Sequence, residues 1–279
     1  MDPDTVNDPV LVAACQVSLA VGEVARNRAT ALEAVSQAAD HGARIVVLPE
    51  LTPSGYVFRD AAEARSLAEP ADGPTVASWA QLARRRGLVV VGGFCELGAD
   101  DAVYNSAVLI DRGAVHAIYR KAHLWDAEKE FFTAGSAAPP VVATEHGRVA
   151  MMICYDLEFP EWVRLPALGG ADLLAVPTNW PAEPVPAGER PMVVANVQAS
   201  AFANRMFIAA ACRCGAERGV SWVGGSIIAG HDGYPLAGPA GPDGPELVLA
   251  GCDLPRARCK ASSPRNDAHA DRRPELYRC

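Results

Sequence analysis

Ten short apolar segments alternate with segments of helical periodicity, and this alternation limits the possible folds more than any other feature of the chain. Several apolar segments lack a polar face, which is typical of strands covered on both sides. Two of the four helical segments end at a glycine, Gly42 or Gly87. The alternation predicts an α/β fold. The predicted strands cover 10–17, 44–50, 88–97, 104–110, 115–120, 148–154, 172–178, 206–212, 223–230 and 246–252, and the predicted helices cover 23–43, 75–87, 160–171 and 193–205.

The connections between these segments indicate one domain. Residues 111–113, Asp-Arg-Gly, predict a hairpin turn between two strands, so that the sheet is mixed. The chain shows no internal repeat and no linker rich enough in Gly, Ser or Pro to separate two domains. We therefore expect a single domain over residues 1–279, with a core of about 10–255 and a C-terminal tail of 256–279. The Pro-rich segment 179–191 predicts a loop over a site.

The charge of the chain excludes some partners. Its 33 acidic and 25 basic residues give a net charge of −8, which disfavours nucleic acid or an anionic membrane as a main partner. No apolar run approaches the roughly 18 residues of a membrane helix.

The acidic N-terminus lacks the basic start of a secretory signal, so we expect a cytoplasmic protein. We expect its eight cysteines to be free thiols, and Cys212-x-Cys214 has no second pair that would indicate a metal site.

Three ionisable residues follow predicted strands. Glu50 ends "RIVVLPE", Lys121 ends "VHAIYRK", and Cys154 ends "RVAMMIC". Taken singly, each has an ordinary explanation: a solvated loop charge for Glu50 and Lys121, or a small core residue for Cys154. Taken together, they supply a base, a cation and a nucleophile at strand ends, where α/β proteins place ligand-binding groups. The set predicts a thiol enzyme whose carboxylate takes a proton and whose ammonium stabilises an oxyanion.

The motifs around these residues resemble those of the nitrilase superfamily of carbon–nitrogen hydrolases. "LPELTPSGY", "YRKAHLW" and "ICYDLEFPE" stand in the order of that family's Glu, Lys and Cys motifs. The likeness spans nearly the whole chain, from "AACQ" at 13–16 to "DRRPELY" at 271–277. The resemblance implies a four-layer α-β-β-α sandwich with two mixed sheets. It also implies a thiol mechanism without a cofactor or a metal.

The resemblance also implies roles for individual residues. Glu50 is the expected general base, Lys121 the oxyanion stabiliser and Cys154 the nucleophile. A second acidic residue follows the Lys motif in the family, and the matching position is Glu128, with the neighbouring Glu130 as the competing match. In the predicted mechanism the thiolate attacks a carbonyl carbon, ammonia leaves, and water hydrolyses the thioester.

The residues after the cysteine indicate a branch of the superfamily. Nitrilases typically have Cys-Trp-Glu, whereas this chain has Cys154-Tyr155-Asp156, which resembles amidases and carbamoylases. We expect hydrolysis of a small-molecule primary amide. The alternatives are an N-carbamoyl (ureido) acid amidohydrolase, a nitrilase, an acyltransferase and a non-catalytic binding member. The resemblance also implies a homodimer or higher homo-oligomer. The candidate substrate-binding residues are Tyr56, Trp125, Tyr155 and Trp180, with Phe58 as a further pocket candidate.

Overall fold

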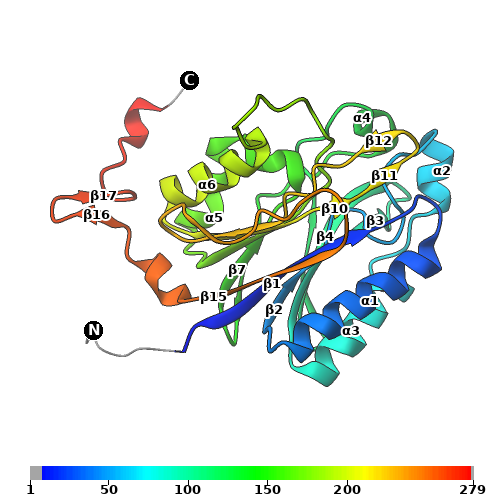
Figure 1. Cartoon of the computed structure of the whole chain (residues 1–279), viewed down its shortest axis with the longest axis horizontal. Coiled ribbons are helices and arrows are strands. Elements are labelled where there is room, and N and C mark those ends of the chain that lie inside the picture. The colour runs from blue at the N-terminus through cyan, green and yellow to red at the C-terminus, as the bar shows by residue number, and fades with distance from the viewer. Residues whose placement is uncertain (1–7, 278–279) are drawn as a thin grey trace.

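Two mixed β-sheets pack against each other in the computed structural model, which describes residues 8–277 (Figure 1). In the first sheet β1, β2 and β3 are parallel, and β3, β4 and β5 are antiparallel neighbours. This sheet has seven strands: β1 (Val10–Ser18), β2 (Ile45–Val47), β3 (Val89–Leu97), β4 (Val103–Asp111), β5 (Ala114–Arg120), β10 (Arg213–Cys214) and β15 (Glu246–Cys252).

The second sheet has a parallel centre and antiparallel edges. Its central strands β7, β8 and β9 are parallel, while β6, β13 and β14 pair in the antiparallel sense. Its six strands are β6 (Val141–Thr144), β7 (Gly147–Met151), β8 (Leu173–Pro177), β9 (Phe207–Ala211), β13 (Ile227–Ala229) and β14 (Pro235–Ala237). Both sheets are therefore mixed, as predicted.

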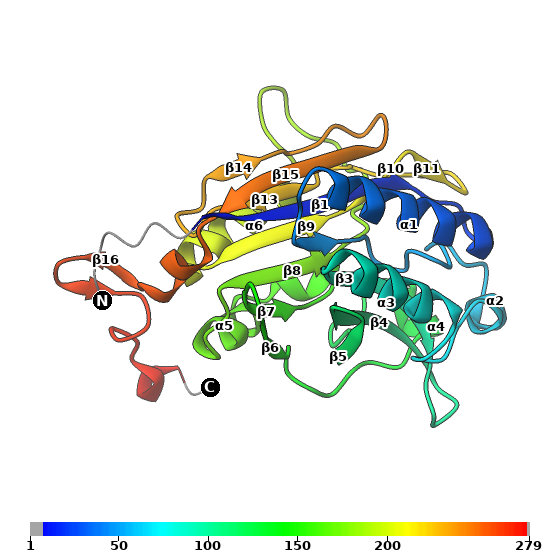
Figure 2. The ribbon, with the colours of Figure 1, turned by 90° about the horizontal axis from the view of Figure 1, so that it is seen from below.

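Four helices form the two outer layers (Figures 1 and 2). Helices α1 (Val24–Asp40) and α3 (Pro74–Arg86) pack on the first sheet, and their apolar faces share one core cluster with β1, β2 and β3. Helices α5 (Pro160–Leu168) and α6 (Met192–Asn204) cover the second sheet. The observed order is helix, sheet, sheet, helix. The predicted four-layer sandwich is thereby confirmed.

Strand β2 illustrates why its residues form a doubly covered strand. Ile45 and Val47 point into the core between the sheets, whereas Val46 points into the core under α1 and α3. Successive side chains of a strand lie on opposite faces, so an uninterrupted apolar run is buried on both. The same rule explains the apolar runs that predicted the other central strands.

The predicted strand 148–154 extends too far. Strand β7 ends at Met151, and Cys154 instead begins a short 3₁₀ helix, Cys154–Glu158. Cys154 has a φ of 45°, a left-handed conformation that no strand residue adopts. Strand 223–230 is also shorter than predicted, since β13 covers only Ile227–Ala229 and Gly224 and Gly225 before it have positive φ values. The predicted helices agree with the observed ones to within a few residues.

Several short elements have no counterpart among the predicted segments. The hairpin of β16 and β17, with the residues that follow it as far as Tyr277, extends away from the rest of the chain (Figure 1). Among residues 8–277 no helix combines the length and the apolar character needed to cross a membrane. The short elements are α2 (Ala61–Ser66), α4 (Glu128–Phe131), β11 (Ala216–Glu217), β12 (Val220–Ser221), β16 (Ala261–Ser263), β17 (Asn266–Asp267) and two further 3₁₀ helices, Leu254–Arg258 and Pro274–Leu276.

Candidate active site

Glu50, Lys121 and Cys154 come together where their strands end. Glu50 follows β2, Lys121 follows β5, and Cys154 follows β7 of the other sheet. The Nζ atom of Lys121 lies 2.7 Å from Oε1 of Glu50, and both side chains are fully buried. Cys154 is 7% exposed, and the charges of Glu50 and Lys121 both act on its thiol. Glu50, Lys121 and Cys154 therefore lie where strands of the two sheets end close to one another.

The carboxylate of Glu50 is held at one oxygen and open at the other. Its Oε1 accepts hydrogen bonds from Lys121 Nζ at 2.7 Å and from Asn105 Nδ2 at 2.7 Å. Its buried Oε2 has no hydrogen-bond partner among the described residues. The backbone carbonyl of Glu50 accepts from Asn179 Nδ2 at 2.9 Å, which anchors the turn to the second sheet. A buried carboxylate oxygen without a donor is free to accept a proton.

Gly93 on β3 explains how the Glu50 turn can lie so close to the sheet. The Gly93 amide donates to the carbonyl of Pro49 at 3.0 Å. A Cβ atom at position 93 would lie 2.6 Å from the Cα of Glu50. Only glycine therefore allows the backbone of the turn to pack here without a shift of the main chain.

Glu128, and not Glu130, contacts the lysine. Glu128 Oε1 lies 2.8 Å from Lys121 Nζ and accepts the phenol of Tyr56 at 2.6 Å, while its Oε2 accepts the Trp125 amide at 3.1 Å. Glu130 is exposed on the other side of the single turn of α4. The lysine ammonium therefore lies between two buried carboxylates, those of Glu50 and Glu128.

Asp156 connects the Cys154 turn to the end of β5. Its buried carboxylate accepts hydrogen bonds from the Ile153 amide at 3.1 Å and the Tyr119 phenol at 2.8 Å. It also accepts the His123 amide at 3.0 Å and the His123 ring Nδ1 at 2.7 Å. These bonds hold the left-handed turn at Cys154. The amide of Tyr155 lies in the first turn of the 3₁₀ helix, where amides have no partner within the helix.

Burial sets the protonation of the site. It raises the pKa of Glu50 to about 7, although Lys121 opposes the rise. Burial and the charge of Glu50 together raise the pKa of the Cys154 thiol well above its ordinary value, although Lys121 lowers it. Burial lowers the pKa of Lys121, but the carboxylates of Glu128 and Glu50 outweigh it and the net shift is upward. The resting site therefore pairs a neutral thiol with a carboxyl group that titrates near neutrality.

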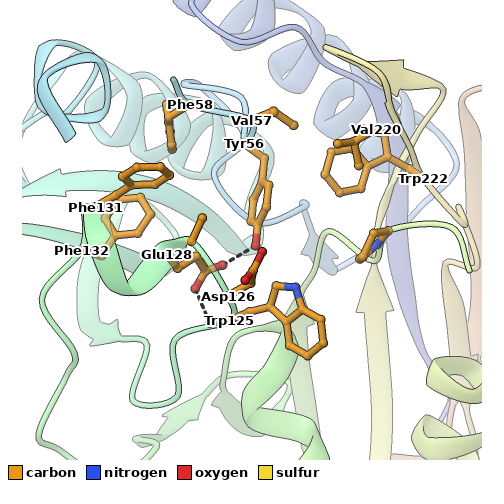
Figure 3. Close-up of a pocket in the computed structure, with 12 residues that line it drawn as sticks. Tyr56, Val57, Phe58, Trp125, Asp126, Glu128, Phe131, Phe132, Val220 and Trp222 are labelled. Carbon is orange, nitrogen blue, oxygen red and sulfur yellow. Dashed lines mark hydrogen bonds between the residues drawn. The ribbon is translucent and has the colours of Figure 1, made fainter. Parts of the chain in front are cut away.

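A pocket of about 300 Å³ borders this group on the side of Glu128 (Figure 3). We call it the aromatic pocket because half of its lining residues are aromatic. Phe131, Phe132 and Trp222, which the sequence analysis did not select, are among them. The twelve lining residues are Tyr56, Val57, Phe58, Trp125, Asp126, Ala127, Glu128, Phe131, Phe132, Pro181, Val220 and Trp222.

The four candidate substrate-binding residues fall in different places. Tyr56 and Trp125 line the aromatic pocket. Tyr155 is half-buried, and its ring contacts the Trp125 ring edge-on, with centroids 4.9 Å apart. Trp180 is buried in the core between the sheets, and its amide donates to the Cys212 sulfur at 3.3 Å. It does not line the pocket, although the following residue, Pro181, does.

Other residues of the site carry weaker sequence signals. Asn105 and Asp156 are fully buried polar residues, and a buried polar residue in a functional region indicates a specific hydrogen-bonding task. Asn105 interrupts the apolar run of β4, which was the available signal. Within residues 8–277 no group of three or more His, Cys, Asp or Glu side chains is arranged to hold a metal ion.

Comparisons with known proteins relate this chain to enzymes that hydrolyse carbon–nitrogen bonds. The carbon-nitrogen hydrolase family matches residues 11–260. A protein named nitrilase from Pyrococcus abyssi is 35% identical over 96% of this chain and 99% of its own length. An N-carbamoylputrescine amidase from Solanum lycopersicum is 33% identical over 98% of this chain and 95% of its own.

Solved structures of an amidase from Nesterenkonia sp. AN1 show a similar fold. One has a TM-score of 0.78 and 29% identity, covering 96% of this chain and 98% of that chain. A mutant of that amidase carries the acetamide moiety of fluoroacetamide, added covalently at the active-site cysteine. These relatives differ in the substrates that their names give, so the comparisons define a reaction type more closely than a substrate.

Proposed function

The chain belongs to the carbon-nitrogen hydrolase family and is a hydrolase of carbon–nitrogen bonds, and from this premise we propose that it hydrolyses a small primary amide through a thioester on Cys154. The observation that carries this proposal is the open Oε2 of Glu50, on a buried carboxyl group whose pKa burial raises to about 7. A general base works best when its pKa lies near the working pH.

The first half of the reaction forms the thioester. Glu50 takes the thiol proton of Cys154, and the sulfur attacks the carbonyl carbon of the amide. The charge that develops on the carbonyl oxygen faces the ammonium of Lys121 and the amide of Tyr155. Glu50 then returns its proton to the amide nitrogen. The carbon–nitrogen bond breaks, and ammonia leaves.

The second half releases the acid. Glu50 takes a proton from water, and the resulting hydroxide attacks the thioester carbon. The thiolate of Cys154 leaves and recovers the proton from Glu50. Throughout the cycle Glu128 holds the ammonium of Lys121 toward Glu50 and Cys154, since Lys121 Nζ lies 2.8 Å from Glu128 Oε1. No step requires a cofactor.

A second candidate activity is hydrolysis of a carbamoyl amide. The 33% identity to an N-carbamoylputrescine amidase over 98% of this chain supports it. Such a substrate would undergo the same attack by Cys154, but the acyl product would be a carbamic acid that releases carbon dioxide. Carbon dioxide released together with ammonia would therefore identify this activity.

The thioester is tested by mass spectrometry and by ammonia release. We expect a slowly hydrolysed amide to leave an acyl adduct on the peptide that contains Cys154. Cys154→Ala should release no ammonia while keeping the wild-type melting temperature. Cys259→Ala is the matched control, because Cys259 is also a free thiol but is exposed. Ammonia release by Cys154→Ala at the wild-type rate would contradict a thiol mechanism.

The type of substrate is tested by a panel of small amides, ureido acids and nitriles. We expect faster ammonia release from a primary amide than from the matched nitrile. Equal or faster release from the nitrile would place the activity with the nitrilases. Transfer of the acyl group to hydroxylamine in preference to water would instead indicate an acyltransferase.

A further inference from the structure

The aromatic pocket borders residues that contact the proposed catalytic group. Glu128 lines the pocket and also bonds to Lys121. Trp125 lines the pocket as well, and its ring contacts that of Tyr155, the residue after Cys154. An amide whose carbonyl carbon is attacked by Cys154 therefore has this space next to its acyl group.

The walls of the pocket are formed in advance. The rings of Tyr56 and Trp222 meet edge-on with centroids 5.5 Å apart. The ring of Phe58 meets those of Phe131 and Phe132 in the same way, at 6.1 and 5.9 Å. Edge-on contacts of this kind hold aromatic rings in defined orientations. The pocket can therefore bind a ligand without first ordering its own walls.

The buried ion pair of Glu217 and Arg213 supports the part of the pocket wall that contains Tyr56. The Glu217 carboxylate accepts the amides of Tyr56 at 2.9 Å and Val57 at 2.7 Å. Its partner Arg213 is fully buried, with Nη2 2.7 Å from Glu217 Oε1. The Arg213 guanidinium also lies over the ring of Trp222, 4.8 Å from its centroid. One ion pair thus supports two neighbouring parts of the pocket wall, at Tyr56 and at Trp222.

The charges of the pocket are all negative. Asp126 and Glu128 line it, and none of its twelve lining residues is a lysine, arginine or histidine. The nearby Arg218 is engaged elsewhere: it bonds to the carbonyl of Val57 at 2.8 Å and forms an ion pair with Glu63 at 2.6 Å. A carboxylate in the pocket would lose its hydration and meet no opposite charge, which is costly. Apolar walls around an uncharged group carry no such cost.

We propose that the aromatic pocket binds the acyl group of the substrate, accepts apolar acyl groups large enough to carry a phenyl ring, and selects against anionic ones. A volume of about 300 Å³ is at the lower end of the range for small-molecule pockets. This inference rests on the proposed function, because the pocket gains its role from the contacts of Glu128 with Lys121 and of Trp125 with Tyr155. It extends that function from a primary amide in general to one class of primary amides.

The first test compares kcat/KM for four amides. We expect 3-phenylpropionamide to exceed propionamide by about tenfold or more, the order expected for burying an aromatic ring. We expect hexanamide to exceed the monoamide of adipic acid, which ends in a carboxylate. A preference for propionamide over 3-phenylpropionamide would overturn the inference. So would faster turnover of the adipic acid monoamide than of hexanamide.

The second test changes the pocket itself. Val220 is half-buried in β12 and lines the pocket. We expect Val220→Phe to lower the ratio of kcat/KM for 3-phenylpropionamide to that for propionamide. We expect Val220→Lys to raise the ratio for the adipic acid monoamide to that for hexanamide. Val115, which is exposed at the start of β5, provides the matched controls Val115→Phe and Val115→Lys, which should leave both ratios as in the wild type.

The two proposals fail in different ways. If none of the amides releases ammonia, the proposed function fails together with the role of the pocket. If propionamide is hydrolysed through Cys154 but the ratios do not respond to Val220, amide hydrolysis stands and the acyl group binds elsewhere. Because both tests use ratios between substrates, a partly unfolded variant does not mimic the expected result.

Discussion

His123 donates two hydrogen bonds to the carboxylate of Asp156, from its backbone amide at 3.0 Å and from its ring Nδ1 at 2.7 Å. His123 lies two residues after Lys121, and Asp156 lies two residues after Cys154. The pair therefore joins the segment that carries the lysine to the turn that carries the thiol, across the two sheets. We infer that Asp156 is a positioning residue.

Asp156→Asn should impair this connection. An asparagine side chain has one accepting oxygen, whereas the Asp156 carboxylate accepts from four donors. We expect a loss of about 1–3 kcal/mol in the free energy of unfolding, the usual effect of unsatisfied buried groups. We also expect kcat to fall more than KM rises. Asp243→Asn, at an exposed aspartate, is the control. A lower melting temperature with an unchanged kcat would limit Asp156 to a structural role.

The pKa of Glu50 predicts the acid limb of the pH profile. Burial raises this pKa to about 7, so the carboxylate that can take the thiol proton is populated mainly above that pH. We expect kcat/KM to rise with pH and to level off above about pH 7. An acid limb centred near the ordinary pKa of a glutamate, about 4.3, would show that burial does not raise the pKa of the base.

Glu50→Gln should separate the two halves of the reaction. The glutamine keeps the shape of the side chain but cannot take a proton, so turnover at neutral pH should nearly cease. Burial still raises the pKa of the Cys154 thiol in this variant, but the charge of Glu50 no longer adds to the rise, so at pH 9 more thiolate forms than at neutral pH while water still lacks its base. We therefore expect a burst of about one equivalent of ammonia per site, followed by a stall. Steady turnover at the wild-type rate at this pH would contradict a shared base.

Lys121→Ala should remove stabilisation that is needed mainly in the transition state. We expect kcat/KM to fall about 10²-fold or more, as when an oxyanion donor is lost. We expect no recovery in Lys121→Arg, because Nζ lies between two carboxylates, at 2.7 and 2.8 Å, where a planar guanidinium does not fit. Recovery of activity in the arginine variant would show that a positive charge alone is sufficient.

Glu128 and Glu130 provide a matched pair for testing the second acidic residue. Glu128→Gln removes one of the two charges that hold the Lys121 ammonium, so we expect kcat/KM to fall about tenfold or more. Glu130→Gln changes an exposed side chain and should leave kcat/KM at the wild-type value. Measuring kcat/KM of both variants with the same amide decides which of the two glutamates acts in the site. Equal losses in the two variants would remove Glu128 from the site.

Glu217→Gln tests the support of the aromatic pocket. The neutral side chain can still accept a backbone amide but loses the ion pair with Arg213, which is fully buried. Leaving that guanidinium unpaired should lower the free energy of unfolding by about 3 kcal/mol or more. Because the Tyr56 wall shifts while Cys154 does not, we expect a larger rise in KM for 3-phenylpropionamide than for propionamide. Equal changes in the two KM values would show a general loss of stability instead.

Much of the fold follows from short-range pattern. The apolar runs predicted β1, β3 and β15 to within one residue at each end. Strands β1 and β3 are buried on both faces, and such strands appear in a sequence as nearly continuous apolar runs. The same pattern extended the strand before Cys154 too far. Met152 and Ile153 are apolar and buried in the turn that follows β7, so hydrophobicity could not mark where the strand ends.

The sequence by itself determined the set Glu50, Lys121 and Cys154, because each stands in a short motif whose order along the chain can be read directly. The motif favoured Glu128 with Glu130 as the competing match, and only the tertiary structure shows that Glu128 contacts Lys121. It also placed Trp222 rather than Trp180 in the aromatic pocket. These choices depend on contacts between side chains far apart in the sequence, such as Tyr56 with Trp222. Periodicity reports which face of an element is buried, but only the packing of one element on another decides which side chains meet.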